Sequence, residues 1–532
     1  MTQLAERALT APAARTAWRT WLHGHGHLLL AIVGSVAFMI VNPPVADLQA
    51  ADARAAAAAR HVGLGYWLSW FGGSTPGQYS VLTPAVASVI GVTTLAALSV
   101  IAIAMLAGPL LARTDRQRSG TYVVACSALC NLWSGRVPFS VGLAVSLAGL
   151  LLLIRGRPLL GGLINGFATV FSPLAPAFIL LVIAGPAITR PEWRRRLIRF
   201  GIPSLTGLIL PAVLFGAPSP MPFTAPTLAW SVGIVLAAVC LDLPRHLRVG
   251  LFVAAGACVA AFLIPSGVGA NISRYAFLLL PPIVWSSARN PRRIVVLALL
   301  PAFIYSGYVV TRDVSAASKP SAQQTYYQGL RTELLGLSGR SNHRVEVVDT
   351  TTHRAAAELI PDIYLARGWE TQSDSTNNAI FYDPALLNAA SYRDWLDVNA
   401  VAWVAVPTQP GRTYQAEADL VWSGLPYLDE VWSDPQWRLY AVHQPDPIVP
   451  APAKVIRSTE TEVVFDLPTP ATLVLRLRPA RFIRVANTNG TGPPVCLVST
   501  TPDEIKATFP TGGRYVITSG FSVDSPVNRA GC

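Results

Sequence analysis

The chain has 532 residues, of which 52% are hydrophobic and only 13% are charged. Soluble domains carry about 25% charged residues, so this composition excludes an ordinary soluble protein. Apolar runs recur through residues 1–310, and a helix needs roughly 17–25 such residues to cross a bilayer. The long apolar runs stop after Asp313, and the remaining chain is long enough for further domains.

The net charge of +12 is unevenly distributed. Residues 1–310 contain 22 Arg, no Lys and 6 acidic residues, whereas residues 311–532 contain 16 Arg, 3 Lys and 23 acidic residues. An evenly basic chain would suggest a nucleic-acid partner. Because the excess is confined to the apolar part, we interpret it as a signal of membrane topology and predict no nucleic-acid partner.

The apolar region divides into segments that we expect to form a mainly α membrane domain over residues 1–310. The eleven segments are 27–43, 82–110, 121–134, 138–154, 158–172, 174–189, 200–216, 226–243, 249–266, 274–287 and 293–310. Several are shorter than a bilayer is thick and would survive there only when packed among other helices. Residues 158–189 could instead form one broken or re-entrant unit.

A cytoplasmic N-terminus would put 18 of the 22 arginines of this region in cytoplasmic segments. The four arginines left outside are Arg54, Arg60, Arg136 and Arg274. This follows the positive-inside rule, and an odd number of spans then places residues 311–532 outside. Residues 1–26 lack a signal-peptide cleavage pattern, so we expect the first span to be retained. The sequence thus predicts a multi-pass plasma-membrane protein with extracytoplasmic C-terminal domains.

Short elements alternate over residues 311–445 and predict a small α/β domain. The expected helices are 322–336, 353–359, 391–397 and 415–422, and the expected strands are 344–349, 378–383, 400–407, 430–432 and 437–442. A proline-rich boundary follows at 445–453. Segments of period two between 461 and 519 then predict a β-sandwich within 446–532. An oxidising compartment would permit a disulfide between Cys496 and Cys532, but spacing alone does not show that the two meet.

Only two carboxylates of the apolar region fall on the predicted outer side, Asp47 and Asp52, both in the first outer loop (44–81). Residues 46–62 suit an interfacial helix, and the aromatic stretch 67–80 indicates an ordered surface loop at the level of the lipid headgroups. The simplest roles are a helix N-cap for Asp47 and a solvated charge for Asp52. Five positions apart on a helix, the two side chains point about 140° away from each other, so we do not expect them to act as a pair.

Arg136 and Arg274 lie at predicted outer turns. An arginine at membrane depth is costly without a partner, and its planar guanidinium suits phosphate; the alternative is snorkelling to lipid headgroups. With Asp47, the set is typical of glycosyl transfer from a lipid-phosphate-linked sugar. Asp47 would be the general base and the arginines would stabilise the departing phosphate. A single base opposite the leaving group predicts inversion.

The organisation of the chain resembles the GT-C superfamily, whose members are membrane glycosyltransferases that use polyprenyl-phosphate sugars. More narrowly, it is similar to large multi-span membrane proteins of actinobacterial type. The similar stretches are 70–84, 134–144, 270–274 and 365–374. The superfamily implies a base near the end of the first span, which matches Asp47. Leu48 stands where many members have a second acid, so Asp52 remains a rival base.

The resemblance implies a polyprenyl-phosphate sugar donor and an envelope glycan or glycolipid acceptor, as in cell wall biosynthesis. The candidate donor-binding residues are Arg136, Arg274, Asn271, Tyr79 and Gln78. The candidate acceptor-binding residues are Trp70, Arg367, Trp369 and Glu370, for which packing between domains is an equal alternative. No metal or cofactor motif appears, so we predict neither. Two other functions stay open, a transporter or flippase for an envelope precursor and a non-catalytic assembly protein on the same scaffold.

Overall fold

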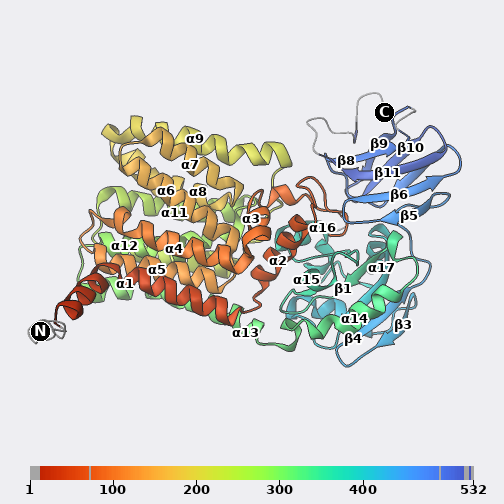
Figure 1. Ribbon diagram of the computed structural model, residues 1–532, viewed down its shortest axis with the longest axis horizontal. Helices are drawn as coiled ribbons and strands as arrows, with labels where there is room; N and C mark the ends of the chain where they lie inside the picture. Colours follow the sequence, from red (N-terminus) through yellow and green to blue (C-terminus); the bar gives the residue numbers. More distant parts are fainter. Residues whose placement is uncertain (1–11, 71–72, 490–492, 521–526, 529–532) are drawn as a thin grey trace, which may run out of the picture.

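The computed structural model describes residues 12–70, 73–489, 493–520 and 527–528. A long helical domain forms one end of the molecule, and two smaller domains that contain the described strands form the other (Figure 1). The prediction of a mainly helical region followed by β-containing domains is confirmed. Helix α2 (Ala46–Ala59) lies at the junction of the two ends.

The helical domain is built from packed apolar helices, and each of the eleven predicted segments contains a helix. Besides α2, its α-helices are α1 (Pro12–Val41), α3 (Thr83–Ile90), α4 (Val92–Leu111), α5 (Gln117–Trp133), α6 (Val137–Ile154), α7 (Pro158–Phe167), α8 (Leu174–Thr189), α9 (Pro191–Phe215), α10 (Ala225–Val239), α11 (Arg245–Leu263), α12 (Leu280–Ser287) and α13 (Arg292–Ala317). Shorter turns are η2 (Pro76–Gln78), η3 (Ala168–Val170), η4 (Gly269–Ile272) and the π-helix η5 (Tyr275–Leu279).

Six described helices are long and apolar enough to cross a membrane, fewer than the eleven spans predicted. They are Gly24–Val41, Val92–Leu111, Val137–Ile154, Pro191–Phe215, Arg245–Leu263 and Arg292–Ala317. The difference lies in five predicted segments whose helices are too short to count: α5, α7, α8, α10 and α12. In the segment 158–189, for example, the chain forms two short helices joined by η3.

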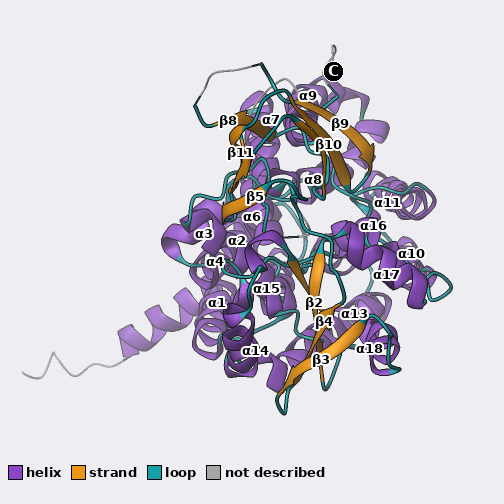
Figure 2. Ribbon diagram, turned by 90° about the vertical axis from the view of Figure 1, so that its right-hand side faces the viewer, coloured by secondary structure: helices purple, strands orange, loops and turns teal. Residues whose placement is uncertain are grey.

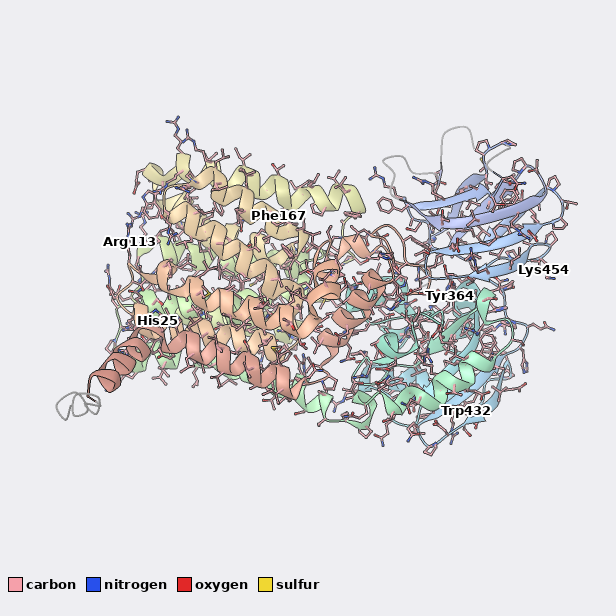
Figure 3. All side chains as sticks on the ribbon, viewed as in Figure 1. His25, Arg113, Phe167, Tyr364, Trp432 and Lys454 are labelled. Carbon is pink, nitrogen blue, oxygen red and sulfur yellow. The ribbon has the colours of Figure 1, made fainter. Side chains whose placement is uncertain are left out.

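The arginine-rich connections lie at the end of the helical domain farthest from the C-terminal domains, where Figure 3 labels Arg113. Arg116 donates to the carbonyl oxygen of Asn290, whose Oδ1 accepts the backbone N–H of Asp242 at 2.5 Å. Three separate connections therefore meet at one surface. This segregation agrees with the predicted topology, which stays a prediction.

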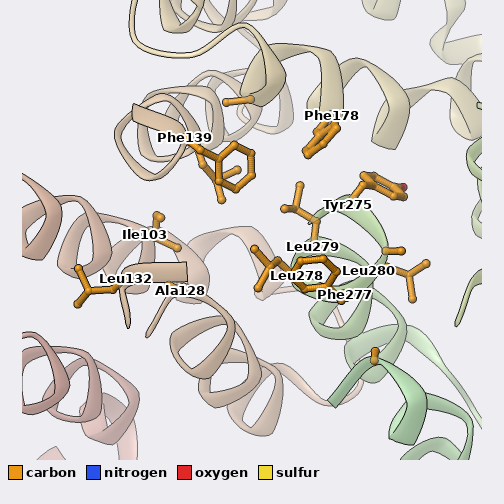
Figure 4. Close-up of a cluster of buried hydrophobic side chains, with 14 of the residues drawn as sticks. Ile103, Ala128, Leu132, Phe139, Phe178, Tyr275, Phe277, Leu278, Leu279 and Leu280 are labelled. Atoms are coloured by element: carbon orange, nitrogen blue, oxygen red, sulfur yellow. The ribbon is translucent and has the colours of Figure 1, made fainter. Parts of the chain in front are cut away.

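Aromatic side chains and closely packed backbones hold the helical domain together. The rings of Phe139 and Phe178 lie 5.7 Å apart, and Phe178 is equally far from Tyr275 (Figure 4). A Cβ atom on Gly207 would lie 2.5 Å from the Cα of Gly166, so α7 and α9 touch through their backbones. Small residues allow this approach where apolar helices lack a hydrophobic driving force between them.

The α/β domain contains one four-stranded sheet of order β1-β2-β4-β3, in which β1 and β2 are parallel and the other pairs antiparallel. The strands are β1 (Arg344–Val347), β2 (Val401–Pro407), β3 (Leu428–Ser433) and β4 (Trp437–Val442). The helices are α14 (Thr325–Gly336), α15 (Ala355–Leu359), α16 (Thr371–Asn377), α17 (Ala389–Val398) and α18 (Gln415–Trp422). Every residue of β2 is buried, as expected of a central strand.

One predicted strand, 378–383, is wrong. These residues follow α16 as a 3₁₀ turn, η8 (Ala379–Phe381). The carboxylate of Asp374 accepts hydrogen bonds from Asn378 at 2.8 Å and from the Tyr382 hydroxyl at 2.6 Å. A buried carboxylate must be satisfied in this way, so the local apolar pattern is overridden and the chain turns around it.

The last domain contains two antiparallel sheets, β7-β10-β9 and β5-β6-β11-β8. The strands are β5 (Lys454–Ser458), β6 (Glu462–Leu467), β7 (Ala471–Leu475), β8 (Ile483–Asn487), β9 (Cys496–Thr501), β10 (Glu504–Phe509) and β11 (Gly513–Ser519). Figure 2 shows the strands of the two sheets side by side. They share one core, in which the rings of Phe465 and Phe509 are 5.6 Å apart. The sequence missed β5, a largely exposed edge strand without a clear alternation.

Four cysteines of the helical domain are free thiols: Cys126, Cys130, Cys240 and Cys258. Cys496 is disulfide-bonded. Cys532, the partner that the sequence suggests, lies outside the residues that the structure describes.

The first outer loop differs most from expectation, because residues 65–70 are buried rather than lying at a membrane surface. Tyr66, Trp67 and Trp70 are each 1% exposed. Trp67 and Trp70 belong to the core of the α/β domain, and Tyr66 belongs to that of the β-domain. The backbone of this loop also bonds to both domains, since Ser69 accepts from Leu365 and Leu68 donates to Glu460. The loop therefore fastens the helical domain to its two neighbours.

Candidate functional site

A cavity of about 360 Å³ lies where the helical domain meets α2 and the α/β domain. Eight residues singled out from the sequence line it: Asp47, Gln78, Tyr79, Arg136, Asn271, Arg274, Trp369 and Glu370. They come from segments that are far apart in the chain. Apolar residues of α8 and α9 form much of the remaining wall, and Thr169 of η3 adds a hydroxyl.

Asp47 lies in the first turn of α2 with its side chain 37% exposed. The N-cap position is occupied by Val45, and no side chain caps this helix, so the N-cap interpretation of Asp47 is wrong. The carboxylate instead faces the cavity, where its Oδ2 lies 3.3 Å from Nε of Arg136. The positive end of the helix dipole also favours a negative charge in this turn.

Asp52 does not line this cavity, in agreement with the opposite directions expected for the two aspartates. It is also not the solvated charge that the sequence suggests. Burial raises the pKa of Asp52 from 3.8 to about 6, an effect that the nearby Arg354 partly opposes. Of the two acids, only Asp47 is placed to meet a ligand in this cavity.

Arg136 immediately precedes α6, and a tight turn places it under Asp47. The preceding Gly135 has a φ of 73°, and a Cβ atom there would lie 2.8 Å from the backbone nitrogen of Leu48. Only glycine allows α2 to approach this closely. The guanidinium has a second acidic neighbour, since its Nη2 lies 3.9 Å from Oδ2 of Asp313 in the last turns of α13. The sequence did not indicate this partner, because Asp313 stands outside the apolar runs.

Arg274 lies between η4 and η5 and also lines the cavity. Its Cζ is 5.7 Å from the centre of the Phe139 ring. Arg136, Asp47 and Tyr79 are close enough to interact with its charge. No described residue forms a hydrogen bond or an ion pair with the guanidinium of Arg274. A cation in this state is available to an anionic ligand.

Arg54 and Glu370 form an ion pair across the cavity wall and join α2 to the α/β domain. The Arg54 guanidinium lies between two rings, 4.9 Å from the centre of Trp70 and 4.0 Å from that of Tyr79. Sequence reasoning missed this pair because it spans 316 positions. Since Arg54 is matched by Glu370 and Arg136 by its two aspartates, Arg274 is the cation without an acidic partner among the described residues of the wall.

Two of the predicted acceptor-binding residues do not reach the cavity. Trp70 is 1% exposed and packs edge-on against Trp67, with ring centres 4.6 Å apart. A Cβ atom on Gly368 would lie 1.1 Å from Trp70 Nε1, so the indole lies directly under the backbone of the 365–370 stretch. Arg367 is 6% exposed. Their burial leaves no surface for an acceptor, and both residues instead hold this stretch in place.

Arg367 is surrounded by three buried acids. Its nitrogens lie 3.0 Å from Glu417 and 3.5 Å from both Glu346 and Asp374. Burial raises the pKa of Glu346 well above its usual range, despite the opposing effect of Arg367. The Tyr392 hydroxyl donates to Glu417 at 3.1 Å. Arg367 and the proton that Glu346 retains thus compensate two of the three acids, and the cluster connects β1, α16 and α18.

Trp369 and Glu370, the other two predicted acceptor-binding residues, do line the cavity. The Trp369 ring stacks on His353 with centres 3.6 Å apart and planes 6° apart. His353 Nδ1 is in turn 2.7 Å from the carboxylate of Asp349. Gln372 nearby donates to the carbonyl oxygen of Gly267 at 2.8 Å. The α/β domain is therefore fixed against the helical domain at the rim of the cavity.

No protein-family model matches this chain, and no curated protein matches it in sequence. Within the described part of the chain, no three His, Cys, Asp or Glu side chains are grouped to hold a metal ion. Function is therefore inferred from the cavity, its geometry and its charges.

Proposed function

We propose that this protein is a GT-C-like membrane glycosyltransferase that transfers a sugar from a polyprenyl-phosphate donor to an envelope glycan or glycolipid. One observation carries the proposal: a carboxylate, Asp47, and an arginine without an acidic partner, Arg274, line the same cavity. Arg136 lies within reach of both. The proposed base and the proposed anion-binding groups can therefore contact one ligand at the same time.

The charges of the wall fit the donor. The phosphate diester of a lipid-linked sugar carries a single negative charge, and the described wall offers one cation in excess, Arg274. A guanidinium binds phosphate oxygens through paired N–H donors. Gln78 and Asn271, whose amide groups can donate further hydrogen bonds, line the same space. We assign the donor phosphate to this side of the cavity.

The proposed reaction is a single displacement. An acceptor hydroxyl oxygen attacks the anomeric carbon while its proton passes to the Asp47 carboxylate. The bond between that carbon and the phosphate oxygen breaks, and its electron pair leaves with the polyprenyl phosphate. Arg274 and Arg136 stabilise the added negative charge. Because attack and departure occur on opposite faces, the sugar is transferred with inversion.

The acceptor would enter from the side of the α/β domain. Trp369 offers an aromatic surface and Glu370 a carboxylate, and both border the cavity opposite the helical wall. Flat aromatic faces pack well against sugar rings because they bury apolar area at little conformational cost. The stacking on His353 holds the Trp369 ring in one orientation. Under the predicted topology, with eleven spans and a cytoplasmic N-terminus, this side is extracytoplasmic.

The test is transfer from a radiolabelled polyprenyl-phosphate sugar by the full chain in lipid nanodiscs. Asp47→Asn should lower the rate by about 10²–10⁴-fold, the usual range for loss of a general base. Asp52→Asn is the matched control on the same helix and should retain transfer. Movement of the labelled lipid across the bilayer without transfer would instead favour the transporter or flippase. Binding without either reaction would favour the assembly protein.

A further inference from the structure

A second cavity of about 200 Å³ lies inside the helical domain. It is lined by residues of α4, α5, α6, α8 and the η5–α12 segment. Only two of its lining residues are polar, Ser127 and Asn131. We call this space the internal channel. Figure 4 shows Ile103, Phe139 and Leu278 extending toward one another from three different helices that border it.

The internal channel is elongated. On α6 its lining residues are Phe139, Leu143, Leu147, Leu150 and Ile154. Their spacings of three and four positions place them on one helix face. From the first to the last of them a helix rises about 22 Å. The channel thus runs along most of α6, from the cavity described above toward the arginine-rich end of the domain.

Phe139 lies where the two spaces adjoin, because it lines both the charged cavity and the internal channel. The guanidinium of Arg274 lies 5.7 Å from the centre of this ring. A group suited to a phosphate therefore lies directly at one end of an apolar passage. This arrangement matches the form of an amphiphile with an anionic head and a hydrocarbon chain.

Protein interiors are close-packed, so an elongated apolar space needs an explanation. Apolar cavities of about 150 Å³ stay free of water and accept hydrocarbon ligands, because water finds no hydrogen-bond partners there. The Asn131 nitrogen donates to the Arg136 carbonyl oxygen at 3.3 Å, whereas its buried Oδ1 has no partner among the described residues. This oxygen and Ser127 are the polar points of an otherwise apolar wall. Hydrocarbon is the chemistry that this channel accepts best.

We propose that the internal channel holds the hydrocarbon tail of the lipid whose phosphate lies at Arg274. This inference rests on the proposed function and adds where the hydrocarbon tail of the donor binds. A single narrow passage suits a single-chain lipid such as a polyprenyl phosphate better than a two-chain phospholipid. The competing place is the surface of α9, whose Ile202, Ile209 and Val213 are 61%, 56% and 62% exposed.

The test uses a polyprenyl phosphate with a photoreactive diazirine at the tail end, bound to the full chain in nanodiscs. Labelling should fall in 103–111, 124–131 and 143–154, and an excess of unlabelled polyprenyl phosphate should suppress it. Labelling confined to α9, or labelling that the competitor does not suppress, would overturn the proposal.

Ala128→Phe fills the channel, because Ala128 is 5% exposed and lines it. It should lower channel labelling at least 10-fold. Cys126→Phe adds a similar ring to the exposed side of the same helix and should change nothing. Ser127→Leu is a milder filling variant if Ala128→Phe fails to fold. Undiminished labelling in both folded filling variants would contradict the proposal.

Transfer measured in the same samples separates this inference from the proposed function. Transfer from a sugar on a butyl phosphate should survive Ala128→Phe, whereas transfer from the long-chain donor should fall at least 10-fold. Wild-type transfer together with α9 labelling would overturn the tail site and leave the glycosyltransferase standing. Channel labelling without transfer from any donor would overturn the glycosyltransferase and leave the tail site standing.

Discussion

Two arginines of this molecule lie in opposite surroundings. Arg367, in the α/β domain, is enclosed by Glu346, Asp374 and Glu417. Arg274, in the cavity wall, has no ion-pair partner among the described residues and faces a space large enough for a ligand. A buried cation with its own acids is a structural element, whereas one without them is available to bind an anion. The comparison distinguishes two arginines that are equally good candidates for ligand binding when only the sequence is considered.

Removing the structural arginine should have the largest effect on stability. Arg367→Met leaves three buried acids without their cation, and breaking a buried ion pair from one side costs about 3–5 kcal/mol. Thermal unfolding of the purified chain and its resistance to proteolysis would measure the loss. Glu346→Gln is the control and should be nearly neutral, because the raised pKa of Glu346 indicates that this carboxyl is protonated. If both variants lost the same free energy of unfolding, Arg367 would be no more important for folding than Glu346.

Arg274→Gln should show the reverse pattern, with normal folding and weak binding. No ion pair is lost, so the unfolding temperature should stay the same or rise. Binding of polyprenyl phosphate should weaken by about 10–150-fold, which corresponds to roughly 1.5–3 kcal/mol for hydrogen bonds to a charged group. Titration in nanodiscs would measure this, and Arg274→Lys should restore part of the affinity. A strongly destabilised Arg274→Gln protein would make Arg274 a structural residue like Arg367.

Asp52 extends the comparison to an acid that has no hydrogen bond or ion pair with a described residue. Its pKa is about 6 in the folded protein and 3.8 as the ordinary value. The folded state thus holds this proton more tightly than the unfolded state does. The resulting stability is complete below pH 3.8 and is lost as the pH rises through 6. Asp52→Asn should therefore stabilise the protein above pH 6, by at most about 3 kcal/mol. Unfolding temperatures measured between pH 4 and 8 should diverge from wild type as the pH rises.

The smallest effect is expected on the surface of the β-domain. Asp466 and Arg514 form an exposed pair across β6 and β11, with Oδ1 and Nε 2.8 Å apart. The hydrogen bond from Arg514 lowers the pKa of Asp466. Exposed pairs of this kind contribute little to stability. Asp466→Asn should leave both the unfolding temperature and the transfer rate unchanged within error, which sets the baseline for the other variants.

The features that could be predicted from the sequence are those that depend on neighbouring residues, such as apolar runs and alternation. Apolar runs placed a helix in each of the eleven segments, and alternation placed most strands. The convergence of Asp47, Arg136 and Arg274 followed from sorting the few charges of an apolar region by side. The two ion pairs that complete the wall did not follow, since Arg54 meets Glu370 and Arg136 meets Asp313 across long stretches of chain. Contacts between residues so far apart in the chain leave no periodic signal in the sequence.

The same limit explains the errors. An aromatic loop near a predicted span reads as an interfacial anchor, but Trp67 and Trp70 are buried by a domain that begins after residue 310. An exposed Arg-Gly-Trp-Glu stretch would suit a glycan, yet Arg367 points into the acids and only Trp369 and Glu370 face the cavity. Arg367 is buried and Trp369 faces the cavity although only Gly368 separates them, and the backbone of Gly368 packs directly on the Trp70 indole.

The buried loop 65–70 has a consequence for the order in which the protein is made. The Trp67 indole donates to Glu460, which is synthesised 393 residues later, and the Tyr66 hydroxyl donates to the carbonyl of Arg478, 412 residues later. A ribosome adds about 5–20 residues per second, so these aromatic side chains wait tens of seconds for their partners. Trp369 and Glu370 of the cavity wall also arrive late. A nascent chain that has not yet reached Arg478 therefore leaves this aromatic loop without its partners, and one that has not reached Gln372 also lacks part of the cavity wall.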